Sequence, residues 1–354
     1  PGKGQLHPAL SGAPWCSADR VPAGTYARSI RGSFATAQLP DWADRRFGTL
    51  THMYDIAIIG AGPAGLSGAL IADSVGMSTC LIESGPIGGT VAKIGHVTNF
   101  LSDATTGPEL VARWQRSLDG TNCDLIRDHA EGLTPIDDGW RVRLRSGNEV
   151  TAGYVLVAAG NRWVRLDEHP LITGVAADIE VIDFWPNEYR RILDADRPLI
   201  IGSDRPLGTF VLTVTDDPDI EPSAWPQVLV LPDKAYALSD VPADVELDLL
   251  WADNIDSIRR DGAGYVVEYR HHGVDAQSRA GHLVPNLGTR PNNQLLTGLA
   301  AIDAAGYVTG GLPARLLIAG DLVQPSHRRI ATAVGEGAHA VLTAYYEAEG
   351  LPGR

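Results

Sequence analysis

Cysteine is scarce in this chain, and the three that occur are Cys16, Cys80 and Cys123. They stand far apart in the sequence and form no Cys-x-x-Cys pair, which argues against a disulfide framework and against a cysteine-based structural zinc site. Cys80 lies inside an apolar, strand-like run, and this position favours a core role over a reactive thiol.

Other common signals are also absent. No apolar run approaches the roughly 20 residues that a membrane-spanning helix needs. The net charge of -14 argues against nucleic acid or an anionic membrane as the main partner. No His-Glu-x-x-His, Gly-x-Ser-x-Gly or phosphate-loop motif occurs, so we expect no metal site and none of the chemistries that these motifs carry. The composition, with 44% hydrophobic and 20% charged residues, is typical of a soluble globular protein.

The first 52 residues differ in composition from the rest. They are rich in Pro, Gly, Ala, Ser and Arg, and they lack the apolar region of a secretory signal. Met53 directly precedes a strong strand pattern, so we expect residues 1–52 to form an extension that is wholly or partly disordered. A docked arm is the alternative. Its aromatic residues would be Trp15, Tyr26, Phe34, Trp42 and Phe47.

The stretch from residue 54 to residue 83 has the pattern of a dinucleotide-binding unit. Ile56–Ile59 predict a buried parallel strand, Leu66–Ser74 a helix, and Thr79–Ile82 a second strand. Glu83 follows the second strand at once, where it can accept hydrogen bonds from a ribose. An acid in this position also argues against a 2′-phosphate.

A Gly-x-Gly-x-x-Gly motif joins the first strand to the helix. Its first glycine permits a tight turn, its second lets the backbone approach a pyrophosphate, and its third allows close helix–strand packing. The helix N-terminus presents free N–H groups to the phosphates. The order of strand, turn, helix, strand and acid therefore predicts dinucleotide binding. The turn consists of Gly60, Ala61, Gly62, Pro63, Ala64 and Gly65.

Two further segments indicate that the dinucleotide is FAD. A double glycine follows the ribose acid, where the chain would pass close to a flavin's ribityl and pyrophosphate groups. Near the other end, Leu316–Ala319 predict a strand that leads to an aspartate able to bind a sugar-like hydroxyl. A long helix then opens, and its N-terminus can face the flavin edge that becomes negative on reduction. The residues concerned are Gly88, Gly89, Thr90, Gly320, Asp321, Arg329 and Ile330.

From about residue 53 to residue 350 the chain resembles the low-molecular-weight thioredoxin reductases of the pyridine-nucleotide disulfide oxidoreductase family. The resemblance rests on "DIAIIGAGPAGLSGAL", "GGTVAKIGHVTNF", "DLIRDHAEGL", "YVLVAAGNRWVRL", "NLGTRPNNQLL" and "GYVTGGLPARLLIAGDLVQPSHRRIATAVGEGAHA", in that order. It implies an α/β fold with two Rossmann-like three-layer nucleotide-binding domains. It also implies a cytoplasmic homodimer.

The resemblance further implies domain boundaries and additional FAD contacts. The FAD domain would be split into residues 53–162 and 281–354, with a smaller NAD(P)-like domain inserted at 163–280. The FAD residues that the resemblance adds are Asn99, Ala130 through its backbone, and Gly160.

The chain departs from the family at the redox centre. The family's Cys-x-x-Cys would fall near residues 181–185, where no cysteine stands. Cys16 and Cys123 do not replace it, because two isolated cysteines have no built-in pairing geometry. We therefore expect no dithiol relay and no dithiol-dependent thioredoxin reduction. The candidates for catalysis near this position are Asp183, Trp185, Glu188 and Tyr189, with packing as the alternative.

The second nucleotide turn of the family corresponds to "PLIIGSDRPLGTF" and is also altered. Gly202 remains, but Asp204 would repel a pyrophosphate and Leu207 is too bulky for close packing of helix on strand. Pro206 suits a first helical turn, so we expect the strand–helix shape to survive. The next strand offers only Lys234 where NADPH would need a clamp of arginines. We expect NADPH binding to be lost, and NADH at an altered site stays open.

Three functions remain open. In the first, a small molecule reacts directly at the flavin, with Arg329 either stabilising the reduced flavin or pointing to solvent. In the second, a ferredoxin-like protein exchanges electrons with the flavin, although acidic carriers would be repelled by this acidic chain. In the third, the protein is a non-enzymatic FAD-binding sensor or scaffold. A local basic patch would favour the second function, and its members would be Arg162, Arg190, Arg191, Arg328 and Arg329.

Overall fold

The computed structural model describes residues 53–95, 97, 99–185, 188–220, 225–323 and 328–351. The expected extension at 1–52 and its alternative as a docked arm lie outside the described residues. Among the helices that are described, none is long and apolar enough to cross a membrane.

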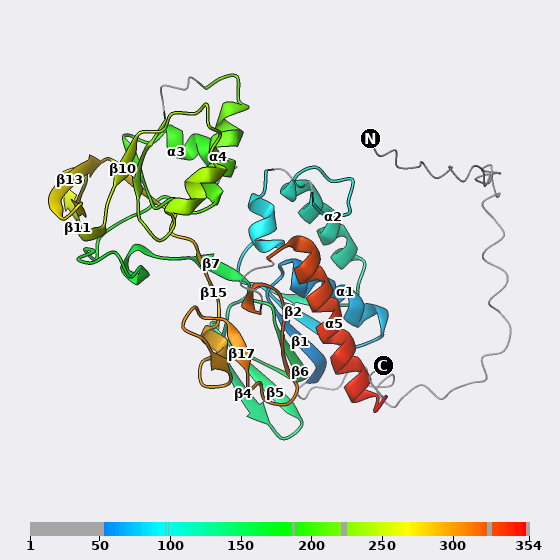
Figure 1. Ribbon diagram of the computed structural model, residues 1–354. Coiled ribbons are helices and arrows are strands. Elements are labelled where there is room, and N and C mark those ends of the chain that lie inside the picture. The colour runs from blue at the N-terminus through cyan, green and yellow to red at the C-terminus, as the bar shows by residue number, and fades with distance from the viewer. Residues whose placement is uncertain are drawn as a thin grey trace, which may run out of the picture. The chain divides into compact units, whose positions relative to one another are not determined.

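The first of two large sheets forms around the predicted strand–turn–helix unit (Figure 1). Its central strands are parallel and are buried towards their C-terminal ends, while the edge beyond β6 is antiparallel. A late strand, β18 (Leu316–Ile318), pairs in parallel with the end of β6, so the C-terminal part of the chain completes this sheet. In spatial order the other strands are β3 (Asp124–Ile126), β2 (Thr79–Ile82), β1 (Met53–Ile59), β6 (Glu149–Val157), β5 (Gly139–Leu144) and β4 (Ala130–Ile136).

Helices α1 (Pro63–Ser74) and α5 (Ile330–Ala348) lie side by side on this sheet (Figure 1). Their buried faces share one hydrophobic core with the strands beneath them. Helix α2 (Gly107–Asp119) begins with a capping box, in which the Thr106 side chain accepts from the backbone of Glu109. Short 3-10 turns flank these helices at η2 (Gly89–Lys93) and η8 (Gly320–Leu322).

The second sheet is fully parallel and has the order β10-β9-β8-β14. Its last strand in sequence lies just after residue 280 and pairs in parallel with β8. Strands β11, β12 and β13 form a separate antiparallel meander in the same part of the chain. The elements of this part are α3 (Tyr189–Leu193), β8 (Pro198–Ile201), α4 (Pro206–Thr215), β9 (Gln227–Val230), η6 (Ala235–Asp240), β10 (Leu249–Trp251), β11 (Asn254–Asp261), β12 (Gly264–His271), β13 (Val274–Ala280) and β14 (His282–Pro285).

A two-stranded antiparallel ribbon links the two sheets. The chain leaves the first sheet through β7 (Asn161–Trp163) and returns through β15 (Thr289–Pro291), and the two strands pair with each other. The topology confirms the predicted α/β fold class, in which one Rossmann-like unit is inserted into another. The remaining short elements are η3 (Leu166–Glu168), η7 (Gln294–Leu296), β16 (Ala301–Ile302) and β17 (Val308–Gly310).

The predicted elements around the first turn are confirmed. The second strand spans Thr79–Ile82 as expected, and α1 begins at Pro63, a few residues before the expected start. Helix α5 opens at Ile330. Cys80 is fully buried on β2, which confirms its core role.

Candidate functional site

The glycines of the first turn have different physical tasks. Gly60 has φ +102°, and a Cβ built there would lie 2.4 Å from the Ala158 carbonyl oxygen. A Cβ on Gly65 would lie 1.8 Å from the Gly60 carbonyl oxygen. Both glycines are therefore needed for packing. Gly62 differs, because a Cβ there would meet nothing within 4 Å. No other described part of the protein fills the space beside Gly62.

The N-terminus of α1 opens into this space. Gly62 is the N-cap, no side chain caps the helix, and its first turn holds no acidic residue. The first N–H groups of a helix carry partial positive charge, so this end suits an anion. Glu83 borders the turn and accepts hydrogen bonds from Ala61 N at 2.7 Å and from Gly85 N at 2.6 Å. These bonds fix the carboxylate beside the glycines.

A second glycine pair faces the first turn. The Gly88 N–H donates to the Ala61 carbonyl at 2.7 Å. At φ +92°, a Cβ on Gly88 would lie 2.2 Å from a methyl of Val111, so only glycine fits. Gly89 lies across from Gly62, since a Cβ built on it would be 3.7 Å from the Gly62 Cα. Gly89 and Thr90 are exposed. The two glycine segments form a cradle around one open space.

The C-terminal segment closes the cradle from the other side. Gly320 has φ +76°, and a Cβ on it would lie 3.3 Å from the Ala64 Cβ. Its N–H donates to Glu336 Oε2 at 2.7 Å. Next to it, Asp321 Oδ2 accepts from Asn161 Nδ2 at 2.6 Å. Burial raises the pKa of Asp321 although Arg328 and the Asn161 hydrogen bond act against that shift.

The remaining predicted residues lie in varied surroundings. Asn99 is exposed, Ala130 is buried at the start of β4, and Ile330 is buried at the start of α5. Gly160 has φ +65°, and a Cβ there would meet nothing within 4 Å. Arg329 is exposed and donates from Nη1 to the Arg328 carbonyl at 2.9 Å, which favours the solvent-facing alternative for its side chain.

Strand register shows which residues of the second turn correspond to the first. Ile59 pairs with Ile82 in the first unit, and Ile201 pairs with Leu229 in the second. The glycine after the first strand donates to the second strand in both units, at 2.8 Å each time. The position of Glu83 is therefore taken by Val230, an apolar residue that is fully buried. The second unit has no ribose acid at this place.

The second turn keeps its shape but carries different side chains. Asp204 stands at the position of Gly62, and its Oδ2 lies 3.2 Å from where a Gly288 Cβ would be. The Lys234 Nζ lies 3.8 Å from the same point. As predicted, Pro206 begins a helix. Leu207 is fully buried in the core below α4. At Gly208 the backbone of α4 comes close to the end of η6, because a Cβ there would lie 2.6 Å from the Asp240 carbonyl oxygen.

A cavity of about 880 Å³ lies beside the linking ribbon. It is lined by residues 161–167, by parts of 175–185 and by Pro285, so it includes the segment at 181–185. Trp163 and Trp185 meet in its wall, with ring centroids 5.1 Å apart at an interplanar angle of 67°. This edge-on contact is a favourable arrangement of aromatic rings. The sequence selects Trp185 as a candidate but not Trp163, since only the path of β7 brings the two rings together.

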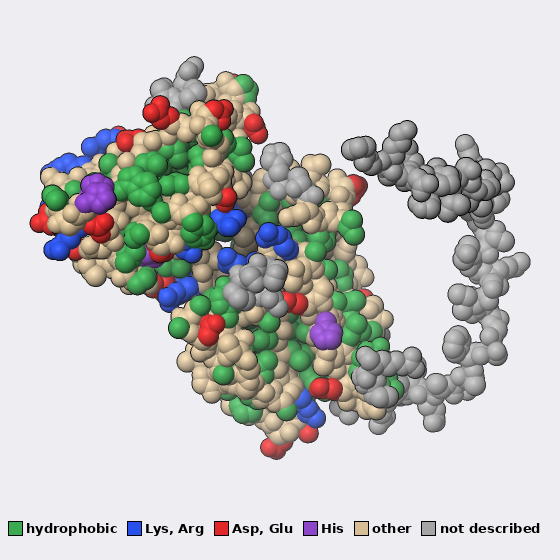
Figure 2. Space-filling view, in the orientation of Figure 1, with side chains coloured by type: hydrophobic (Ala, Val, Ile, Leu, Met, Phe, Trp, Pro, Cys, Tyr) green, Lys and Arg blue, Asp and Glu red, His purple; other side chains and the backbone are tan. Residues whose placement is uncertain are grey.

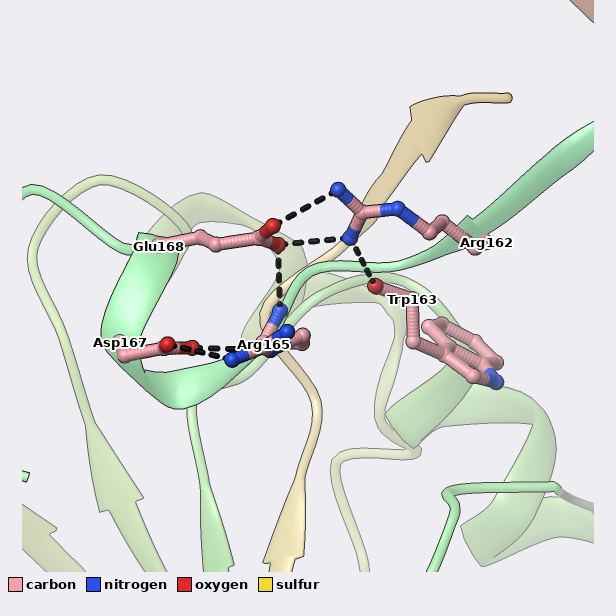
Figure 3. A network of polar contacts seen from close by, with 5 residues as sticks. All are labelled: Arg162, Trp163, Arg165, Asp167 and Glu168. Carbon is pink, nitrogen blue, oxygen red and sulfur yellow. Dashed lines mark hydrogen bonds and ion pairs between the residues drawn. The ribbon is translucent and has the colours of Figure 1, made fainter. Parts of the chain in front are cut away.

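Two ion pairs involve residues of the cavity wall (Figure 3). Arg162 holds Glu168 through two hydrogen bonds of 2.6 and 2.7 Å and also donates to the Trp163 carbonyl at 3.1 Å. The Arg162 side chain accordingly lowers the pKa of Glu168. Arg165 pairs with Asp167 at 2.5 Å.

The other candidates of the 183–191 segment have structural partners. Glu188 forms an ion pair with Lys93, whose ammonium lies 5.7 Å from the Trp185 ring centroid. Tyr189 donates its hydroxyl hydrogen to Asp217 Oδ2 at 2.5 Å. These contacts favour packing roles for Glu188 and Tyr189.

Three of the five arginines expected to form a basic patch are held in ion pairs. Lys and Arg side chains do gather near β7 and β15 (Figure 2). However, Arg162 pairs with Glu168, Arg190 with Asp217, and Arg191 with Glu188. Asp217 is far from Arg190 in sequence, whereas Glu168 and Glu188 are local partners of Arg162 and Arg191. The positive charge available to a partner there is therefore smaller than five free arginines would give.

The chain is similar to known reductases along most of its length. The family model described as pyridine nucleotide-disulphide oxidoreductase matches residues 54–203. A thioredoxin reductase of Peptoclostridium acidaminophilum is 24% identical over 337 residues, which cover 84% of this chain and 99% of that protein. An alkyl hydroperoxide reductase component of Pseudomonas aeruginosa is 25% identical, and the match covers 84% of this chain but 58% of that protein.

Solved structures show the same fold. Thioredoxin reductase of Lactococcus lactis has a TM-score of 0.68 at 22% identity, covering 84% of this chain and 100% of that one. The bacillithiol disulfide reductase Bdr of Staphylococcus aureus has a TM-score of 0.63 at 15% identity, covering 84% and 99%. At these identities the structural likeness concerns the fold.

Proposed function

Because the chain is a thioredoxin reductase-like pyridine nucleotide-disulphide oxidoreductase, we propose that it binds FAD and acts on a small molecule directly at the flavin, without a dithiol relay. One observation carries this proposal. The glycine cradle of the first unit is complete, while the segment at 181–185 contains no cysteine and borders a cavity walled by two tryptophans.

The cradle fits FAD. The space at Gly62 and Gly89 would take the pyrophosphate, whose charge would meet the N-terminus of α1. Glu83 would accept hydrogen bonds from the adenosine ribose, and Asp321 from the ribityl chain. Bound FAD would supply hydride-transfer and electron-transfer chemistry. The further residues that we assign to this site are Gly60, Pro63, Ala64, Gly65, Gly88, Thr90, Asn99, Ala130, Gly160, Gly320, Arg329 and Ile330.

The domain assignment follows from the cradle. We assign residues 53–162 and the segment after Pro285 to FAD binding, and the insert between them to a nucleotide-type domain. The α5 N-terminus has no side-chain cap, so its N–H groups are available to the edge of the flavin. Arg329 would then act mainly through its backbone, because its side chain is exposed.

We further propose that the second turn no longer binds a nicotinamide dinucleotide. Asp204 carries a carboxylate at the position where the first turn has the open glycine, and a phosphate would be repelled there. Val230 at the position of the ribose acid has no atom that could bind a hydroxyl. Lys234 gives a single positive charge, and its backbone carbonyl is engaged by Ser203 at 3.1 Å.

A small molecule is favoured over a protein carrier for a specific reason. An acidic carrier such as ferredoxin needs a basic surface on this acidic chain. Three of the five candidate arginines are held by carboxylates, so little positive charge is left to attract such a partner.

An anaerobic absorbance titration of the FAD-loaded protein tests this function. We expect neither NADH nor NADPH to bleach the visible flavin band, and dithionite to bleach it fully. Rapid bleaching by either nucleotide would show that the second turn still admits a nicotinamide and would overturn that part of the proposal. A protein that stays colourless after incubation with FAD would overturn all of it.

A further inference from the structure

Of the four charged side chains that line the cavity among the described residues, three form ion pairs and one does not. Arg162 is held by Glu168 and Arg165 by Asp167, and the nearby Lys93 is held by Glu188. Asp183 also lines the cavity. It is exposed, and it has no hydrogen-bond or ion-pair partner within the described ranges. Among the described lining residues, Asp183 is thus the charge without an ion pair.

The rest of the lining is largely apolar and aromatic. Trp163 and Trp185 form one wall, and Val175, Ala176 and Ile179 contribute another. The volume of about 880 Å³ lies within the range of small-molecule sites, which is roughly 300–1,000 Å³. Aromatic faces attract planar apolar groups, and they also attract cations.

We propose that this cavity binds a small molecule that carries a protonated amine on a planar aromatic body. The aromatic body would pack against the two tryptophans, and the ammonium group would pair with the Asp183 carboxylate in a charge-assisted hydrogen bond. An anion of the same shape would be repelled by Asp183, because its charge is the one that is not compensated.

The cavity also adjoins the proposed flavin cradle at two points. Asn161 lines the cavity and donates to Asp321. Lys93 stands at the end of η2, which begins with Gly89, and its ammonium lies over the Trp185 ring. A role of the bound amine as substrate rests on the proposed function. Binding of the amine to the cavity does not.

Three probes of matched shape test the proposal. These are 2-(aminomethyl)naphthalene as the cation, 2-ethylnaphthalene as the neutral compound and 2-naphthoate as the anion. Equilibrium dialysis against the full-length protein, with and without added FAD, gives a Kd for each. We expect the cation to bind tightest and the anion at least about tenfold more weakly, a difference of about 1.4 kcal/mol. Equal affinities, or tighter binding of the anion, would overturn the proposal.

Variants test which residue pairs with the ammonium group and where the aromatic body of the ligand lies. Asp183→Asn should remove most of the preference for the cation over the neutral probe and leave the neutral probe unchanged. Asp244→Asn is its matched control, because Asp244 is exposed on a different loop. Ala177→Trp fills the cavity from an exposed lining position and should weaken all three probes.

Trp185→Leu should also weaken all three probes, whereas Trp251→Leu should not, since Trp251 lies on β10 and is 44% exposed. If Trp185→Leu fails to fold, Ala177→Trp still decides the location. A cation preference that survives Asp183→Asn would refute the role of that carboxylate. Dialysis results are independent of the nucleotide titration, so the two proposals can fail separately.

Discussion

In the first turn, one glycine leaves room for a ligand and two others are required by the fold. Gly62 has φ -76° and ψ -174°, which any residue adopts, and a Cβ there would have open space. Alanine at this position is therefore compatible with the fold, although it occupies the space assigned to the pyrophosphate. Gly60 and Gly65 are different, since any side chain there would overlap backbone atoms.

Gly62→Ala should fold normally and bind FAD poorly. We expect the unfolding free energy without FAD to stay the same or rise by up to about 1 kcal/mol, because alanine restricts the unfolded chain. FAD affinity should fall at least about tenfold. Thermal unfolding without FAD and a fluorescence titration with FAD measure the two effects. An unchanged FAD affinity would mean that the pyrophosphate does not lie at Gly62.

The ionisation of Asp321 is expected to change the stability of the folded protein with pH. Burial raises its pKa, so the charged form costs stability in the folded protein. Its favourable contribution is fully present below the unfolded pKa of about 3.9 and is lost as pH rises through the higher folded pKa. Without FAD, Asp321→Asn should therefore be as stable as the parent or more stable at pH 7, and the difference should shrink towards pH 4.

The same variant should bind FAD more weakly, because a carboxylate is the stronger acceptor for a ribityl hydroxyl. Unfolding between pH 4 and pH 8 and an FAD titration check both effects. Lower stability of the FAD-free variant at pH 7 would show that Asp321 holds the fold rather than the ligand.

At the scale of elements, the crossing of α1 and α5 sets the cradle. A Cβ on Gly337 would lie 1.9 Å from the Ala64 carbonyl oxygen, so this glycine allows the two helices to touch. Gly335, on the same helix, is exposed, and a Cβ there would meet nothing within 4 Å. The two positions form a matched pair for testing whether helix contact supports the site.

Gly337→Ala should destabilise the protein by about 1–3 kcal/mol, because the helices must move apart. It should also weaken FAD binding, since the N-termini of both helices border the cradle. Gly335→Ala should instead stabilise α5 by roughly 0.5–1 kcal/mol and leave FAD binding unchanged. Urea unfolding with and without FAD distinguishes them. Similar results for both variants would contradict the packing argument.

Elements with strong local patterns could be predicted, and features that depend on distant partners could not. The strand–turn–helix unit is readable because buried parallel strands form short apolar runs and the glycines have fixed spacing. Gly208 could not be identified, because its role depends on where η6 lies against α4. The pairing of Arg190 with Asp217 likewise depends on a loop that local sequence does not place.

At the scale of the whole molecule, the remaining question is how electrons pass through the chain. Cys123 immediately precedes Asp124, which pairs with Cys80 across β2 and β3, so the two cysteines lie close together although they are far apart in sequence; their side chains pack into different cores on opposite faces of the sheet. Spacing along the chain does not reveal this. Both are free in the structure. Burial raises the pKa of both thiols, and that of Cys123 to about 12. Thiols in this state are poor nucleophiles.

A thiol count checks that this pair is no hidden redox centre. Cys16 is removed first as Cys16→Ser, because it lies outside the described residues. At pH 8 a thiol with a pKa near 12 is ionised roughly a thousandfold less than a free cysteine. The native FAD-loaded variant should therefore show almost no fast reaction with Ellman's reagent, and two thiols should react in guanidinium chloride. Fast labelling of the native protein, or fewer than two thiols after unfolding, would indicate a reactive or oxidised pair. Such a result would return a thiol relay to the electron path of this molecule.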